Sequence, residues 1–423
     1  MRQRQGNRRG LAIGVVLIGG IALSAQALGQ DLRFGFDQRF EASDNQALRA
    51  PSQGSSLTST SRLSFGYTSE TPAATFQFGG SGVLRGVSGA VKGQGGFQDP
   101  SLRMSYTRTA ASGEFGLSAR LTSNEIAFLR PFEDFLDPET GEFVPPEDLE
   151  DLTGSGRRTS YGADARLRLG DQARVGTTLR AGIRGTRYQG VTNPALVDSR
   201  RVSAGLGLRF SLSNVTEAVL DMGWSRFSNQ SALQPDRDTL SLSLGLSHDR
   251  PDGRLTARLS AEKRDASRTR YGISLGRSHD LLRGGLSYGL GVTWGDAAGR
   301  RLNGNIAWTH ELPDGQIRLA VNHGLATGSN DSTRQVTSAT FGWQHRVTEL
   351  SALSLDMGLH DSRNLTTGTS VRNVSLGLGY SHQITEDWAL NTGYRHRQRD
   401  SSGTQARSNT VFLSVRRDFA TRF

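Results

Sequence analysis

Apolar and polar residues alternate with a period of two along most of the chain, from residue 31 to its end. Residues 240–247 read LSLSLGLS, 353–360 read LSLDMGLH and 374–381 read VSLGLGYS. Successive side chains of a β-strand point to opposite faces, so each such segment has one apolar and one polar face. The pattern predicts an all-β protein built from two-faced strands.

About 20 segments of this kind follow one another, or 18 to 22 if one pair is split or merged. They are expected at residues 31–41, 58–69, 73–84, 101–110, 113–123, 157–169, 173–188, 199–211, 216–228, 237–248, 253–265, 268–279, 283–295, 300–310, 315–326, 333–345, 350–362, 370–382, 387–398 and 407–419.

The connections between these segments alternate in length. Short turns such as Pro251-Asp252 and Pro313-Asp314 alternate with longer connections such as 42–57, 85–100 and 124–156. Short periplasmic turns and longer outer loops are typical of a transmembrane antiparallel up-and-down β-barrel. A soluble β-sandwich needs fewer strands for one core, and a parallel β-helix lacks this alternation. An even number of strands places both termini at the end with the short turns.

The end of the chain has the same parity pattern. Val411, Leu413, Val415 and Phe419 share one face with Phe423, the last residue. Here the sequence resembles Gram-negative outer-membrane β-barrel proteins of the porin-like kind, whose last strand ends in an aromatic residue. The resemblance implies that Phe423 is the signal read by the barrel-assembly machinery. It also implies an environment of outer-membrane lipids and lipopolysaccharide, hence localisation in the cell outer membrane.

The N-terminus has the features of a secretory signal peptide. Four arginines and no acid precede the apolar run 11–23, and Ala25-Gln26-Ala27 gives a small-x-small cleavage pattern. Residues 1–30 are therefore expected to be a cleaved signal. Residues 31–423 form the barrel, with 124–156 as a long acidic loop.

The composition agrees with a protein that crosses the membrane by β-strands. Hydrophobic residues make up 35% of the chain, mean hydropathy is −0.45 and cysteine is absent. A bundle of transmembrane helices is thus excluded, since each span needs about 20 apolar residues. The formal charge of +10 would on its own suggest nucleic acid as a partner. Four of these charges lie in the signal, and an exported barrel does not meet nucleic acid.

No catalytic or metal site stands out, and no cofactor is expected. Five histidines, at 248, 279, 310, 345 and 382, each close a strand beside a short turn, at spacings of 31, 31, 35 and 37 residues. This repeat suggests growth by hairpin duplication. All five share the parity of the apolar face, so they are expected in an interfacial belt with aromatic residues. Only His360 is expected to face the lumen, and an enzyme is not predicted.

The polar face lines the lumen and is rich in arginine. Low-dielectric walls with charge of one sign concentrate ions of the opposite sign, so an anion-preferring pore is expected. The alternative is that these arginines are paired with loop acids or are merely solvated. The predicted pore-lining residues are Arg103, Arg120, Arg166, Arg168, Arg180, Arg209, Arg258, Arg318, Arg395 and Arg416.

The connection 124–156 is the longest and most acidic. Ten acids and the single base Arg130 give it a net charge of −9. Its position, length and charge resemble the third loop of general porins, which folds into the channel. An acidic loop gains Coulomb energy by entering a basic lumen, although a solvated surface loop is the open alternative. The predicted constriction residues are Glu133, Asp134, Asp137, Glu139 and Glu142.

These features favour an outer-membrane channel for passive diffusion of small hydrophilic solutes, with small anions preferred. Two alternatives remain open at this stage. One is an exporter of an acidic exopolysaccharide, which the basic lumen fits equally well. The other is a filled, non-conducting barrel with a structural or adhesive role.

Overall fold

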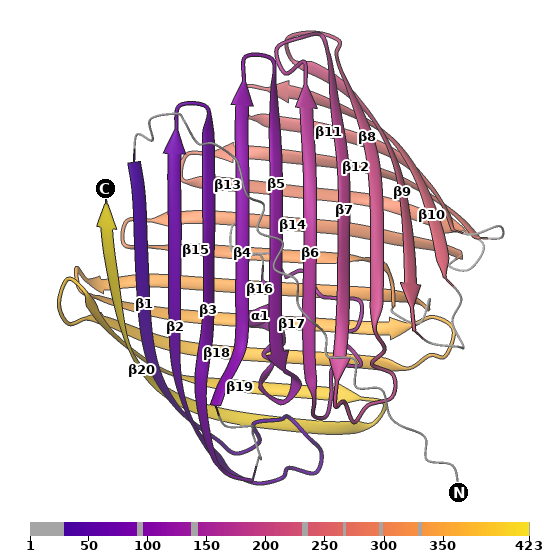
Figure 1. The fold of residues 1–423 in the computed structure, drawn as a ribbon. Helices are drawn as coiled ribbons and strands as arrows, with labels where there is room; N and C mark the ends of the chain where they lie inside the picture. Colours follow the sequence, from indigo (N-terminus) through magenta and orange to yellow (C-terminus); the bar gives the residue numbers. More distant parts are fainter. Residues whose placement is uncertain are drawn as a thin grey trace, which may run out of the picture.

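The chain forms one closed antiparallel barrel of 20 strands (Figure 1). The computed structural model describes residues 29–90, 96–136, 143–230, 236–264, 268–295, 299–328 and 332–422. Each strand pairs with its neighbours in the sequence, and the pairing of β1 with β20 closes the ring. The predicted fold class and strand number are confirmed.

The strand bounds follow the predicted segments to within a few residues. They are β1 (Gly29–Ser43), β2 (Ser56–Thr71), β3 (Ala74–Gly89), β4 (Gly96–Ala110), β5 (Gly113–Glu125), β6 (Arg157–Leu169), β7 (Val175–Gln189), β8 (Ser199–Ser211), β9 (Thr216–Asn229), β10 (Arg237–Arg250), β11 (Gly253–Arg264), β12 (Arg268–Leu281), β13 (Gly284–Gly295), β14 (Gly299–Leu312), β15 (Gly315–Thr327), β16 (Thr333–Thr348), β17 (Ser351–Asn364), β18 (Ser370–Gln383), β19 (Trp388–Ser401) and β20 (Thr404–Arg422).

The outer face of the barrel is apolar. Leu240, Leu244, Leu275 and Leu290 are 56%, 51%, 65% and 74% exposed, respectively. So much exposed aliphatic surface is unfavourable in water but matches the hydrocarbon of a bilayer. The outward band is therefore the membrane-contacting surface, and the polar parity of each strand faces the interior.

Tight turns join the strands at one end. The turn between β10 and β11 ends at Gly253, which has a φ of 133°. A Cβ atom there would lie 2.1 Å from the carbonyl oxygen of Ser278 on β12. Only glycine tolerates both this backbone conformation and this approach, so the sequence Pro-Asp-Gly fixes the start of β11.

Histidine–aromatic pairs mark the same end. The ring centroids are 5.8 Å apart for Trp308 and His310 and 5.7 Å for Trp343 and His345. The Tyr380 and His382 rings are 6.4 Å apart. Each pair is stacked with nearly parallel planes and belongs to the outward parity, as in the aromatic girdles of membrane barrels.

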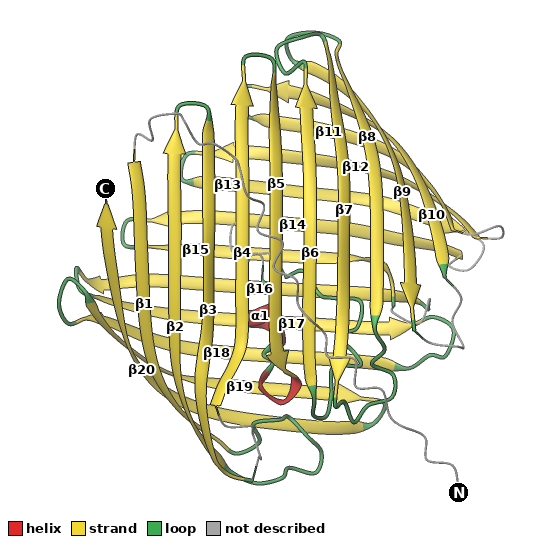
Figure 2. Ribbon diagram, viewed as in Figure 1, coloured by secondary structure: helices red, strands yellow, loops and turns green. Residues whose placement is uncertain are grey.

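The longest connections lie at the opposite end, and one of them contains the helical turns η1 (Ile126–Phe128) and α1 (Pro131–Asp134). Figure 2 shows these two turns against an otherwise all-strand molecule. Within the described ranges, no helix is long and apolar enough to cross a bilayer. Strand β1 begins at Gly29, so its first two residues fall in the segment predicted as the end of the signal.

Candidate functional site

Arginines face one another across neighbouring strands of the inner wall. Arg103 on β4 stands directly opposite Arg120 on β5, and Arg166 on β6 opposite Arg180 on β7. Directly opposed like charges destabilise a sheet. Positive charge is therefore concentrated on this wall even though it weakens the pairing of the strands that carry it.

Four of the predicted pore-lining arginines have no acid partner among the described residues. Arg103, Arg120, Arg166 and Arg258 are exposed, and in the described part of the chain no carboxylate lies within 4.0 Å of any of them. Arg318 is also exposed and donates from Nε to the side-chain oxygen of Gln316 at 3.0 Å. These five side chains leave their charge available to whatever occupies the lumen.

The other predicted arginines are paired. Four of them bind acids on the strands or turns around them: Arg168 with Glu114 at 3.6 Å, Arg180 with Asp221 at 3.1 Å, Arg209 with Glu217 at 3.1 Å and Arg416 with Asp418 at 2.7 Å. The remaining one, Arg395, forms an ion pair with Glu133 of the loop.

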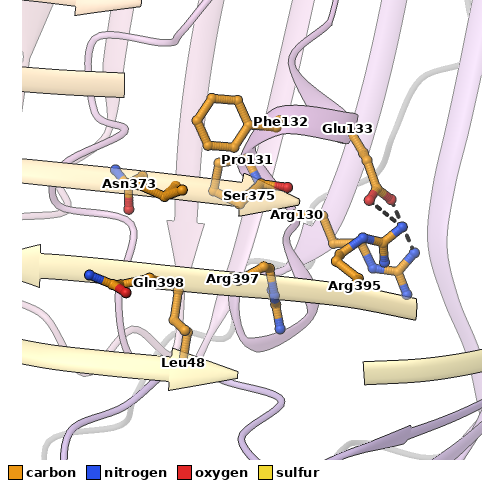
Figure 3. A pocket seen from close by; sticks show the side chains of 11 residues that line it. Leu48, Arg130, Pro131, Phe132, Glu133, Asn373, Ser375, Arg395, Arg397 and Gln398 are labelled. Carbon is orange, nitrogen blue, oxygen red and sulfur yellow. Dashed lines mark hydrogen bonds and ion pairs between the residues drawn. The ribbon is translucent and has the colours of Figure 1, made fainter. Parts of the chain in front are cut away.

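The loop makes its first contact with the inner wall through α1. Glu133 pairs with Arg395 of β19 and, at 3.4 Å, with Arg130 (Figure 3). Arg130 in turn pairs with Glu41 of β1, whose side chain is 4% exposed. The chain Arg395–Glu133–Arg130–Glu41 joins α1 to the inner wall where β19, β20 and β1 meet.

Asp134 follows Glu133 in the sequence and lies beside these ion pairs. It accepts a hydrogen bond from the backbone N–H of Arg130 at 2.7 Å. Asp134 is exposed at the surface of the loop, yet the protein around it removes much of its bulk hydration, and this desolvation raises the pKa of Asp134 to about 6. Asp134 thus changes its charge near neutral pH.

The second contact point of the loop is the opposite wall. Glu147 pairs with Arg201 of β8 at 2.5 Å and with Arg237 of β10 at 3.3 Å. Next to it, Asp148 accepts from Nε of Arg158 on β6 at 2.8 Å and from the hydroxyl of Tyr188 on β7. These contacts hold residues 147–148 against β6 to β10.

The third contact point of the loop lies on the same side of the barrel as the first. The Glu150 side chain pairs with Arg334 of β16, and its backbone oxygen accepts from Arg399 of β19 at 2.5 Å. Glu147 thus contacts β8 and β10, and Glu150 contacts β16 and β19, strands that stand about six to nine places apart in the ring of 20. Because Glu147 and Glu150 are only three residues apart and reach opposite walls, the segment between them crosses the barrel interior.

Aromatic contacts support the same path. Phe132 lies on β17 at Gly358, and Phe143 is 4% exposed with its ring 5.4 Å from that of His360, also on β17. At the root of the loop, the guanidinium of Arg85 lies 4.1 Å from the ring centre of Phe128. Apolar burial thus adds to the ion pairs that hold the loop inside.

Sequence reasoning missed most of the arginines that hold the loop. Arg158, Arg201, Arg237, Arg334 and Arg399 were not among the predicted lining residues, although each continues the inward parity of its strand. Extending the parity to the strand ends nearest the loop would have found them. Their environment differs from that of the unpaired arginines: the Arg158, Arg237 and Arg334 side chains are 10%, 6% and 7% exposed.

Some predicted residues lie outside the described part of the chain. These are Asp137, Glu139 and Glu142 of the loop, Phe423 at the C-terminus and residues 1–28 of the expected signal. Among the described residues, no group of three or more histidines and carboxylates is arranged to hold a metal ion.

Comparison with known proteins gives a likeness of fold alone. No protein-family model matches the chain, and a sequence search of curated proteins finds no match. A variant of the ferric enterobactin receptor from Pseudomonas aeruginosa has a TM-score of 0.54 at 10% identity, with 92% of this chain and 80% of that chain covered. OpdK from Pseudomonas aeruginosa has a TM-score of 0.43 at 12% identity, with 93% and 99% covered.

The receptor likeness extends over most of both chains and, at 10% identity, shows a shared fold. This chain adds a closed ring of 20 strands, an apolar outward band and histidine–aromatic pairs at the end with the short turns. Together these features make it an outer-membrane β-barrel.

Proposed function

We propose that the barrel is a passive channel for small hydrophilic solutes that prefers anions. The observation that supports this most directly is the set of exposed inward arginines with no carboxylate partner in the described part of the chain, Arg103, Arg120, Arg166 and Arg258. Such charges in a lumen with low-dielectric walls raise the local concentration of anions and their rate of entry.

The proposal depends on where the acids of the loop lie. Glu133, Glu147, Asp148 and Glu150 all pair with arginines other than these four. These four acids of the loop therefore do not neutralise the exposed arginines on β4 to β6 and β11. We assign it the role of narrowing the lumen, while the free arginines select the solute.

Planar-bilayer recording of the refolded mature chain under a salt gradient tests this proposal. We expect discrete channels and a reversal potential of the sign that anion preference gives. A cation-selective reversal potential would reject the arginine-wall argument, and correctly folded barrels that form no channels would reject the porin function.

A second function, passage of an acidic polysaccharide, is favoured by one specific feature. The opposed pairs Arg103–Arg120 and Arg166–Arg180 place four inward arginines on four neighbouring strands, β4 to β7. An extended polyanion could contact several of these side chains at once. Block of the ionic current by an oligouronate, but not by a neutral oligosaccharide of equal length, would favour this function over diffusion of small solutes.

A further inference from the structure

Uncharged hydrogen-bonding side chains gather on one part of the inner wall, beside the exposed Arg258 of β11. They are Ser274 on β12, Thr293 on β13 and Asn303 on β14, which we call the hydroxyl–amide cluster. All belong to the polar parity of their strands and therefore face the lumen. This part of the wall differs from the basic wall over β4 to β7, where arginine stands opposite arginine.

Strand pairing brings Arg258 and the cluster together. Ser274 stands directly opposite Arg258, and Gly291 of β13 stands opposite Ser274 on one side and opposite Asn303 on the other. Side chains that are directly opposite on neighbouring strands have their Cβ atoms about 4.5–5.5 Å apart. One row of inward positions therefore runs from the guanidinium group on β11 to the amide group on β14.

The space over Gly291 is where the uncharged groups meet. A Cβ atom there would clash with Oδ1 of Asn303 and would lie 2.9 Å from the Cβ of Ser274. Nδ2 of Asn303 donates to Oγ1 of Thr293 at 2.7 Å, which orients the amide and leaves Oδ1 without a donor among the described residues. A second arginine, Arg301 of β14, stands opposite Thr293.

These groups have a definite preference in the chemistry of a solute. A guanidinium group forms its strongest hydrogen bonds with an anionic oxygen such as that of a carboxylate. Hydroxyl and amide groups both donate and accept hydrogen bonds, as the hydroxyls of a sugar do. An alkyl chain against the cluster would displace the water on these groups and offer no hydrogen bond in return.

We infer that the channel favours polyhydroxylated carboxylates, the class of the sugar acids, over carboxylates of equal charge that lack hydroxyls. The inference rests on the proposed function, since it concerns which anions pass. Arg258 binds the carboxylate, and Ser274 and Asn303 bind hydroxyls of the same solute. The basic wall over β4 to β7 attracts any anion, whereas the hydroxyl–amide cluster distinguishes one anion from another.

The test compares gluconate with hexanoate, which share one negative charge and six carbons. Reversal potentials of the refolded mature chain in planar bilayers are measured at pH 8 with potassium chloride on one side and either potassium salt on the other. We expect gluconate to be more permeant by about threefold or more, the effect of one net hydrogen bond. Gluconate is the bulkier anion, so size alone gives the reverse order.

The outcomes separate this inference from the proposed function. A channel that prefers chloride to potassium, yet passes hexanoate at least as readily as gluconate, would overturn the inference and leave the proposed function standing. A channel without anion preference would overturn both.

Paired variants assign the preference to this part of the wall. Ser274→Val with Asn303→Leu removes the hydrogen-bonding groups and should abolish the gluconate advantage, whereas Ser274→Thr with Asn303→Gln should keep it. The matched control, Thr178→Val with Ser203→Val, removes two inward hydroxyls from β7 and β8 and should also keep it. Heat-modifiable migration on a gel verifies that each variant is folded. A gluconate advantage that survives in the first pair, or that is lost equally in the control, would overturn the inference.

Discussion

At the scale of single residues, the contact between Phe132 and β17 is unusually close. A Cβ atom built on Gly358 would lie 2.5 Å from Cδ1 of Phe132, inside van der Waals contact. The absence of a side chain at this wall position is therefore what lets α1 reach the wall. The phenylalanine ring and the glycine form one packing unit, although they belong to distant parts of the chain.

Replacing Gly358 with alanine should displace Phe132 and loosen α1. Overpacking of this kind typically costs about 1–3 kcal/mol. We expect faster proteolysis of the loop in the folded barrel. Gly377→Ala is the matched control, because its Cβ would meet nothing nearer than 3.8 Å. Equal proteolysis of the two variants would contradict this account of the contact.

Asp134 should make the ion preference depend on pH. Desolvation raises its pKa to about 6, so the carboxylate becomes neutral as the pH falls through that value. Loss of a negative charge from the loop should increase the anion preference between about pH 7 and pH 5. Reversal potentials across this range measure the effect, and Asp134→Asn, which keeps an acceptor for the Arg130 N–H, should remove most of it.

The same shift has a consequence for stability. Since the pKa of Asp134 is raised in the folded state, the folded chain binds this proton more tightly than the unfolded chain between about pH 4 and pH 6. The contribution of Asp134 to stability therefore falls as the pH rises through this window. Asp134→Asn should be relatively more stable at pH 7 than at pH 4, as denaturant unfolding at the two pH values would reveal.

At the scale of elements, the loop is a crossing segment fixed at both walls. Glu147 binds Arg201 and Arg237 on one side, and Glu150 binds Arg334 on the other. The Arg334–Glu150 pair is buried, and removing one partner of such a pair typically costs about 3–5 kcal/mol because the other charge is left uncompensated. The Arg201–Glu147 pair is partly exposed and contributes less. The wall arginines thus depend on the loop as much as the loop depends on them.

Releasing this segment should widen the path through the barrel. The double variant Glu147→Gln, Glu150→Gln should raise the single-channel conductance and its noise, and deletion of residues 131–150 should raise it further. Glu114→Gln, which breaks the strand pair with Arg168, is the control and should leave the conductance nearly unchanged. Unaltered conductance in the deletion variant would mean that the loop does not narrow the path.

Sequence alone could predict the strands because each has one face in lipid and one in a polar interior. The resulting alternation is local, and the expected segment 199–211 coincides with β8, Ser199–Ser211. The partners of the loop are not local. Glu150 meets Arg334 only because the ring closes and brings β16 to the path of the loop. Charge and length indicated an inward loop, but not which arginines would receive it.

At the scale of the whole molecule, the charge is divided between two kinds of arginine. Arginines that pair with the loop, such as Arg237 and Arg334, are buried and compensated. Arginines away from the loop, such as Arg103 and Arg258, are exposed and unpaired in the described part of the chain. The described acids of the loop therefore neutralise part of the basic wall, and under the proposed function the remaining arginines act on solutes.

This division predicts which charges set the selectivity. Changing Arg103, Arg120 and Arg166 together to glutamine should shift the reversal potential towards that of a non-selective pore and leave folding intact, since it relieves repulsion between opposed guanidinium groups. A triple variant of outward arginines, Arg187→Gln, Arg200→Gln and Arg226→Gln, removes the same charge from the other face of β7 to β9. An equal shift in both triple variants would show that overall charge, and not the lumen wall, determines the preference.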